Sequence, residues 1–168
     1  MFASLSLRAA ALIAALVLAP PAAAQNAEPY FASLKFEETN GRIGPSFDHP
    51  VRWKYRRAGL PVLVLEESGG LWMRVADPEG DVVWVYSNGV SKARTAIVTD
   101  GPPADLRRET SADSPLRAQL SPGLVVEVAR CADGRCRVKT GAVAGFVAAD
   151  RLWGATGKDA ARRAAELH

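Results

Sequence analysis

An internal repeat constrains the fold of this chain more than any other feature of its sequence. The stretch GLPVLVLEESGGLWMRV (59–75), followed by GDVVWVYSNGV (80–90), is matched by GLVVEVARCADGRCRV (123–138), followed by GAVAGFVAADRL (141–152). Each copy contains Gly-Leu, an apolar run, a tight glycine turn, an x-Arg-Val run, a second glycine turn and a final run with an aromatic-Val pair. The repeat therefore predicts two similar small β modules.

Short runs rich in Val, Leu, Trp and Tyr alternate with Gly and Pro along most of the chain. Many short strands separated by turn signals are typical of a small barrel or sandwich. The Ala-rich end, 157–168, is predicted to be a short helix, although two to three turns alone are marginal in water. The predicted strands are 33–39, 51–57, 61–67, 71–77, 82–87, 94–99, 115–120, 124–131, 136–140 and 144–149.

The first 24 residues have the features of a secretory signal. Arg8 is the only charged residue before residue 28, and it precedes the apolar run AAALIAALVLAP and a small-residue cleavage site that ends at Ala24. The apolar run is shorter than the roughly 20 residues that a membrane span needs. We therefore expect a signal peptide over 1–24 and a periplasmic or secreted protein with no stable membrane span.

The remaining chain is divided by its composition into two modules. We expect an N-terminal linker at 25–31, the first module at 32–99, a linker at 100–103 that contains Pro102-Pro103, the second module at 104–154 and a tail at 155–168. The predicted fold class is all-β, with two small barrels in tandem between the signal and the short helix. Domains of this size have marginal cores.

The chain has two cysteines, Cys131 and Cys136, on either side of Asp133-Gly134. Asp-Gly predicts a two-residue hairpin turn, which would make the cysteines a directly opposed pair, close enough for a disulfide. Export favours this reading, because disulfides persist in oxidising compartments. Free thiols and a redox or metal site are the alternatives, although a tetrahedral zinc site needs about four ligands.

The same segments resemble the tandem bacterial SH3-like proteins of proteobacterial envelopes. NGRIGPS (40–46) is similar to the family's N-x-R-x-G-P-S opening, and HPVRWKYRRAGLPV (49–62) to its P-V-x-W…G-L-P-V stretch. The resemblance implies small β-barrels that act as binding or targeting modules at the cell wall, without catalytic residues. Shorter matches lie at 72–75, 83–85, 94–98, 115–118, 136–138, 145–147 and 151–154.

The chain departs from the family pattern at three places. Gly41 stands where the family usually has an apolar strand residue, and Val83 replaces the usual Gly of Gly-Trp-Val. The second module lacks the N-x-R-x-G-P opening. These changes leave the fold credible and weaken the inference of a shared ligand site.

The residues that catalysis requires are missing from the sequence pattern. Nucleophilic catalysis needs a nucleophile, a base and an orienting group, and His49 is the only interior histidine, expected in an exposed turn before a proline. Neighbouring carboxylates such as Glu66-Glu67 point to opposite faces of a strand, so they form no acid/base pair. We predict no enzyme activity, no cofactor and no metal site.

Binding has better support, from aromatic residues beside cations. VRWKYRR (51–57) alternates with period two, so that aromatic and basic side chains occupy opposite faces. The bland interpretation is an apolar inner face and a solvated basic outer face; the alternative is an aromatic groove that takes a peptide or a muropeptide carboxylate. The first module also contains most of the aromatic residues. The candidate ligand-binding residues are Arg42, Trp53, Tyr55, Arg56 and Trp72.

These features predict an exported binding module whose partner is peptidoglycan or an envelope protein. The formal net charge of +3 suggests weak attraction to anionic surfaces, but export argues against nucleic acid. The first alternative is a periplasmic assembly or interaction factor with no cell-wall ligand, whose strand edges pair with other chains. The second is an enzyme accessory protein that lacks its own active site.

The cysteine analysis predicts the outcome of a thiol titration. The oxidised protein should contain no reactive thiol, folded or denatured, until a reductant is added, because both cysteines are joined. Two reactive thiols in the denatured but unreduced protein would contradict the pairing.

Overall fold

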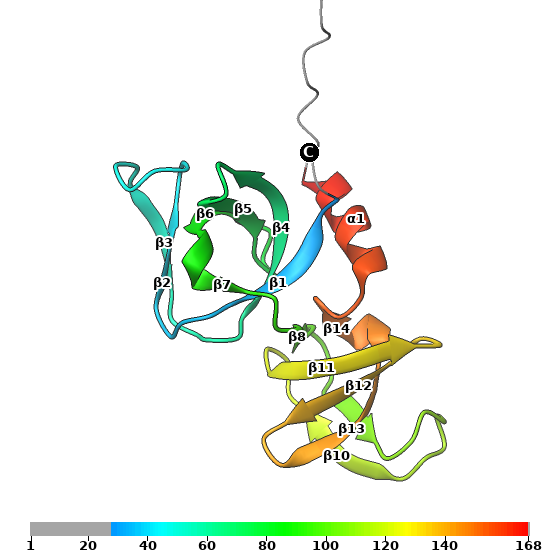
Figure 1. The fold of residues 1–168 in the computed structure, drawn as a ribbon. Coiled ribbons are helices and arrows are strands. Elements are labelled where there is room, and N and C mark those ends of the chain that lie inside the picture. The colour runs from blue at the N-terminus through cyan, green and yellow to red at the C-terminus, as the bar shows by residue number, and fades with distance from the viewer. Residues whose placement is uncertain (1–27, 168) are drawn as a thin grey trace, which may run out of the picture.

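The protein consists of two β modules and a C-terminal helix (Figure 1). The computed structural model describes residues 28–167, so the expected signal peptide at 1–24 lies outside the described residues. Within 28–167, no helix is long and apolar enough to cross a membrane.

Each module is built on one antiparallel sheet of seven strands. The first sheet contains β1 (Tyr30–Leu34), β2 (Thr39–Arg42), β3 (Val51–Tyr55), β4 (Pro61–Ser68), β5 (Trp72–Ala76), β6 (Val82–Tyr86) and β7 (Val90–Ser91). The second contains β8 (Thr95–Val98), β9 (Ala104–Arg107), β10 (Leu116–Leu120), β11 (Val125–Ala132), β12 (Arg135–Thr140), β13 (Val143–Ala148) and β14 (Leu152–Trp153). The helices are η1 (Ser87–Gly89), η2 (Ala149–Arg151) and α1 (Gly157–Glu166).

The two sheets have the same topology. Their strand orders are β3-β2-β6-β5-β4-β1-β7 and β10-β9-β13-β12-β11-β8-β14, so each strand of the first sheet corresponds to the strand seven places later. A one-turn 3-10 helix precedes the last strand of each sheet. The all-β tandem fold and the short C-terminal helix predicted from the sequence are confirmed.

The boundary between the sheets lies earlier in the chain than expected. Strand β8 pairs with β11 and β14, and Ala96 and Val98 lie in the second core, so residues 95–98 do not close the first sheet. Pro102-Pro103 accordingly lies between β8 and β9 rather than between the modules. At the other end, β1 begins at Tyr30, inside the stretch expected to be a linker.

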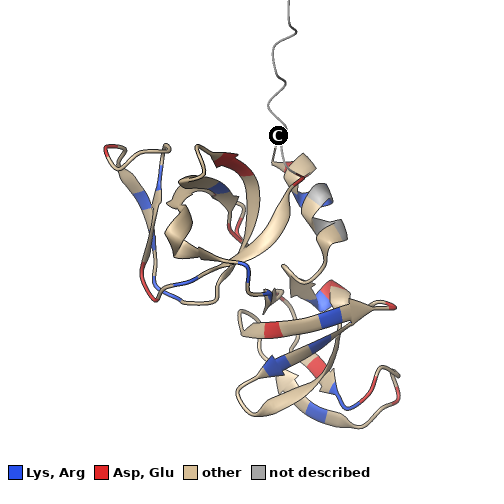
Figure 2. Cartoon of the chain, viewed as in Figure 1, with Lys and Arg blue, Asp and Glu red and all other residues tan. Residues whose placement is uncertain are grey.

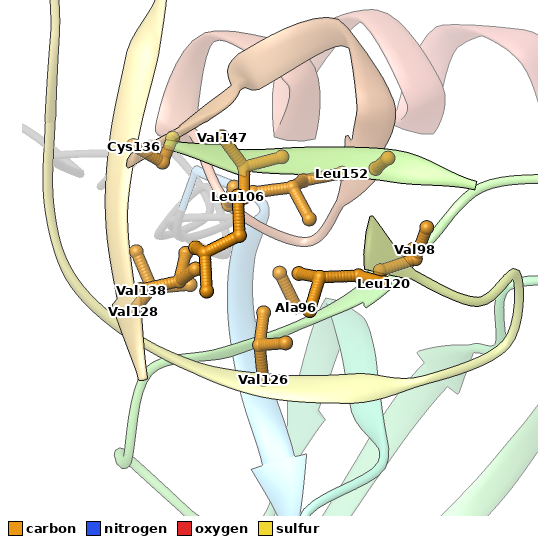
Figure 3. Packing of buried hydrophobic residues seen from close by; sticks show 12 residues of the cluster. Ala96, Val98, Leu106, Leu120, Val126, Val128, Cys136, Val138, Val147 and Leu152 are labelled. Atoms are coloured by element: carbon orange, nitrogen blue, oxygen red, sulfur yellow. The ribbon is translucent and has the colours of Figure 1, made fainter. Parts of the chain in front are cut away.

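The second module has a core of aliphatic side chains and Cys136, most of which are labelled in Figure 3. Alternate residues of its strands point inward, as period-two alternation requires. The core is lined at one end by Cys136, which forms the expected disulfide with Cys131. The hairpin between them turns at Asp133 and Gly134, both with positive φ, 50° and 72°, which a type I′ turn requires. The disulfide therefore joins β11 and β12 beside their turn.

The two family departures, Gly41 and Val83, compensate for each other in the first core. A Cβ on Gly41 would lie 2.7 Å from Val83 Cγ2, so Val83 fills the space that an apolar residue on β2 would occupy. The second module has the reverse arrangement: Leu106 on β9 fills the space, and a Cβ on Gly145 of β13 would lie 2.9 Å from Leu106 Cγ. In the first module the large side chain lies on β6, and in the second it lies on β9, the equivalent of β2. Because the same space is filled in both modules, neither departure disturbs the fold.

This compensation predicts a strong coupling between the two positions. Gly41→Leu should lower the free energy of unfolding by about 1–3 kcal/mol, because it overpacks the core. Val83→Gly should cost about 2–4 kcal/mol through its cavity and added chain entropy. The double variant should be more stable than the sum of the two losses implies, by at least about 1 kcal/mol, in urea unfolding followed by circular dichroism. Simple additivity would contradict the compensation.

A third apolar cluster joins the modules to the helix. Trp153, from the last strand of the second sheet, packs edge-to-face on Phe31 of β1, with ring centroids 5.0 Å apart. Ala160 and Ala164 of α1 are buried in the same cluster, against the outer face of the first sheet at Leu63 and Ala76. Helix α1 lies alongside the first module in Figure 1. This packing stabilises a ten-residue helix that would be marginal alone.

Two tryptophans with opposite surroundings test the importance of this cluster. Trp153 is 8% exposed and Trp53 is 45% exposed. Trp153→Ala should lower the free energy of unfolding by about 3 kcal/mol, as expected for a buried tryptophan, whereas Trp53→Ala should cost less than about 1 kcal/mol. Urea unfolding measures both. Equal losses would mean that the cluster contributes little to stability.

Candidate functional site

The first module has an aromatic pocket, formed where the loop between β2 and β3 covers the ends of β5 and β6. Phe47 of this loop packs against Trp72 and Tyr86, with ring centroids 5.0 and 5.2 Å away, and these two rings are 5.5 Å apart. The pocket has a volume of about 180 Å³, smaller than the usual ligand cavity, so it fits one side-chain-sized group. Its lining residues are Phe36, Glu38, Thr39, Asn40, Arg42, Phe47, Trp72, Tyr86, Asn88 and Gly89.

The pocket exposes aromatic surface that a stable core would bury. Phe47 is 65% exposed and Phe36 is 43% exposed, whereas Trp72 below them is 8% exposed. Trp72 and Tyr86 are directly opposed residues of β5 and β6, so the sheet holds the pocket floor rigidly. The tight turn before Trp72 is made by Gly69 and Gly70, both with positive φ. A rigid aromatic floor with an exposed aromatic rim is suited to hold an apolar or flat group.

Arg42 connects the loop to the sheet. Its Nη1 donates a hydrogen bond to the His49 carbonyl oxygen at 2.6 Å, and its guanidinium carbon lies 5.7 Å from the Phe47 ring centroid. The second module repeats the first of these contacts, because Arg107 Nη1 donates to the Ser114 carbonyl oxygen at 2.8 Å. The arginine therefore holds the loop in both modules, which is a structural role. The contact between the arginine and an aromatic ring, Arg42 with Phe47, is found in the first module.

One of the residues that line the pocket has a buried hydroxyl without a partner. Thr39 is 7% exposed, and its Oγ1 has no hydrogen-bond partner within the described residues. Glu38, which also lines the pocket, pairs with Lys54 at 3.1 Å, so its charge is compensated. An unpaired buried hydroxyl is costly, and a polar ligand group is one partner that would remove this cost.

The structure brings only two of the five predicted site residues, Arg42 and Trp72, into the pocket. Trp53 lies on the edge strand β3 and is largely exposed, so the expectation that Val51, Trp53 and Tyr55 form an inner face holds for Tyr55 alone. Arg56 is exposed after the end of β3. Neither Trp53 nor Arg56 lines the pocket.

Tyr55 has a structural role in the first core. Its hydroxyl donates to Asp77 Oδ2 at 3.0 Å, while Asp77 Oδ1 accepts the backbone N–H of Asp81 at 2.9 Å. Burial, and then the negative charge of Asp77, raise the pKa of Tyr55 above its ordinary value, so it remains a neutral donor. This hydrogen bond anchors the β5–β6 turn, away from the pocket.

Sequence reasoning missed Phe36, Phe47 and Tyr86. The aromatic excess of the first module was the available signal, and it included Phe47 and Tyr86. The sequence pattern gave no sign that the loop between β2 and β3 folds over the sheet. That folding brings Phe47 into contact with Trp72 and Tyr86, which are distant in sequence.

The second module has no equivalent of this pocket floor. From the strand register, Arg135 occupies the position of Trp72, and Ala148 occupies that of Tyr86. The two modules thus share a backbone plan but present different side chains at the same place. The aromatic excess of the first module forms a surface feature as well as packing.

The described residues contain no metal-binding cluster. No group of three or more His, Cys, Asp or Glu within 28–167 is placed to hold a metal ion. His49 is partly buried rather than exposed as expected, because its ring packs on Gly44, where a Cβ would lie 2.5 Å from Nε2. The glycine at 44 is thus required by packing.

Comparison with known proteins identifies the family of both modules. The model of the Bacterial SH3 domain family matches residues 35–92 and 100–154. No curated protein matches the chain. Among solved structures, NlpC2 and NlpC1 from Trichomonas vaginalis each share 13% identity with a TM-score of 0.34. The matches cover 74% and 83% of this chain but 48% and 50% of those chains, so the chain spans about half their length.

Proposed function

Because the chain belongs to the Bacterial SH3 domain family, a family of binding domains, we propose that it is an exported, non-enzymatic binding protein. Its ligand in this proposal is peptidoglycan or a peptide of the cell envelope, and the first module holds it. The observation that carries the proposal is the aromatic pocket, with Phe47 exposed above the rigid pair Trp72 and Tyr86.

The chemistry of the pocket favours a peptide over a purely charged ligand. One apolar or flat group fits the volume between the rings. Thr39 and Arg42 also line the pocket, and the hydroxyl of the first and the remaining N–H groups of the second could serve a carbonyl or carboxylate oxygen. Binding through a few buried anchors is the usual source of specificity in such interfaces. The peptide stems of peptidoglycan offer both kinds of group.

The disulfide supports the cellular location in this proposal. Cys131 and Cys136 are joined, which fits an exported protein, since such bonds persist in oxidising compartments. We propose the periplasm as the location.

A second candidate function, protein–protein assembly, rests on strand β3. Among the described strands, this one pairs only with β2, so its other edge is free of the described residues, and Val51 and Trp53 on it are 43% and 45% exposed. An exposed strand edge with apolar side chains is a template for pairing with an extended segment of another protein. In this alternative, the partner adds a strand to the first sheet.

Retention on isolated sacculi tests the first proposal. Phe47→Ala should reduce retention at least about fivefold, because it removes the exposed ring that completes the pocket. Phe47 is preferable to the buried Trp72 as the target, because its loss leaves the core intact. Retention of the wild type should persist when the salt is raised from about 0.15 M to about 0.5 M, since screening weakens mainly exposed charge pairs.

Trp53→Ala is the matched control, because it removes an aromatic residue from the same module outside the pocket. It should leave sacculus retention unchanged while weakening any partner that pairs with β3. Loss of retention in Trp53→Ala with none in Phe47→Ala would transfer the site to the edge strand. Circular dichroism of each variant establishes that it is folded.

A further inference from the structure

We infer that the groove between the two modules is a second binding site, which takes an oxyanion group, carboxylate or phosphate, carried on an extended chain. The groove consists of two cavities of about 600 and 780 Å³, both within the range of ligand sites. They share Arg94, Gly154, Thr156 and Gly157 as lining residues, so they are two ends of one depression. We call it the junction groove.

Among the described residues that line the junction groove, cations outnumber carboxylates. These residues include five Lys and Arg against three Asp and Glu, and Figure 2 shows basic residues on the short segment that joins the two sheets. The basic residues come from separate parts of the fold: the connecting segment, the start of β12, and α1. The cations are Lys92, Arg94, Arg135, Arg162 and Arg163.

Within the described residues, three of these cations, Lys92, Arg94 and Arg135, take part in no ion pair. On the faces of the modules, Arg52, Lys54 and Arg107 each pair with a carboxylate. Within the described residues, Lys92 and Arg135 take part in no ion pair and no side-chain hydrogen bond. Charges left unpaired beside a concave surface raise the local concentration of anions.

Arg94 lies where the two cavities meet and is already oriented. Its Nη2 donates to the Ala155 carbonyl oxygen at 3.0 Å, which holds the guanidinium between the modules without neutralising it. An arginine held in this way loses little side-chain entropy on binding and presents its remaining N–H groups to an oxyanion.

One residue that lines the first cavity, Thr95, has a buried hydroxyl that also lacks a partner. Thr95 is 8% exposed, and its Oγ1 has no hydrogen-bond partner within residues 28–167. A polar ligand atom would supply that partner and remove the cost of an unpaired buried group. The acidic Glu67 on the same cavity accepts a hydrogen bond from the Tyr30 hydroxyl at 2.6 Å, so it is engaged within the protein.

The first cavity has walls from both modules: β1 and Glu67 of the first, and the residues after β14 of the second. The second cavity is lined by the connecting segment, by the β11–β12 turn and other residues of the second module, and by α1. The site is distinct from the aromatic pocket and independent of the function proposed for it.

Calorimetric titration of the full chain with defined probes tests the inference. A tetraglutamate peptide should bind and a tetraglutamine peptide should not. Arg135→Gln should weaken tetraglutamate binding about tenfold, the usual effect of one charge-assisted hydrogen bond, and Lys92→Gln with Arg135→Gln should weaken it further. Inorganic phosphate is titrated in parallel. If phosphate binds and the same variants weaken it, a single oxyanion is sufficient for binding. If tetraglutamate binds and phosphate does not, the ligand must carry several carboxylates on one chain.

The matched control is Arg137→Gln. Arg137 is exposed on the same strand, two residues from Arg135, and lines neither cavity, so the change in net charge is identical. It should alter the affinity by less than about twofold. Equal weakening by both variants, or no binding of either anion, would overturn the inference. Phe47→Ala should leave tetraglutamate binding unchanged. The inference about the junction groove can therefore fail without affecting the proposal for the aromatic pocket, and the reverse also holds.

Discussion

The packing of Trp153 and α1 on the outer face of the first sheet is the interaction on which the arrangement of the molecule depends. Small β modules have little core of their own, and a sheet leaves one face of each strand outside that core. Here the outer face at Leu63 and Ala76 is covered by the last strand of the second module and by the helix. The two modules are thereby held together by a shared third core rather than by a flexible linker, and this contact also creates the junction groove.

The two modules show how one backbone plan carries different surfaces. Their strand orders are identical, and Arg42 and Arg107 hold equivalent loops through backbone carbonyls. The second module thus keeps the structural arginine of the opening motif that its sequence otherwise lacks. The first residues of the equivalent strands β5 and β12 differ, however: the first module has Trp72 and the second has Arg135. One position therefore contributes to an aromatic pocket in one copy and to a basic groove in the other.

Most of the fold followed from local pattern, while much of the site did not. Period-two runs, glycine turns and the repeat were sufficient for most of the strands, and the Asp133-Gly134 turn was sufficient for the disulfide. These patterns missed β9, and the strand predicted at 33–39 spans the gap between β1 and β2. The pocket depends on the loop that brings Phe47 over Trp72 and Tyr86, and such a contact leaves no periodic signal. Trp53 and Tyr55 looked equivalent in the alternation of β3, yet one is on an exposed edge and the other donates to Asp77.

The sequence by itself determined the class of the fold, its duplication and its cysteine pairing, because each of these arises from interactions between residues close along the chain or from a regular spacing. Only the tertiary structure decided which sheet β8 joins, how Val83 substitutes for the bulk missing at Gly41, and which cations remain unpaired. These outcomes depend on contacts between strands distant in sequence. Such contacts are selected by how completely apolar surface is buried across both modules together, and no single segment contains that information.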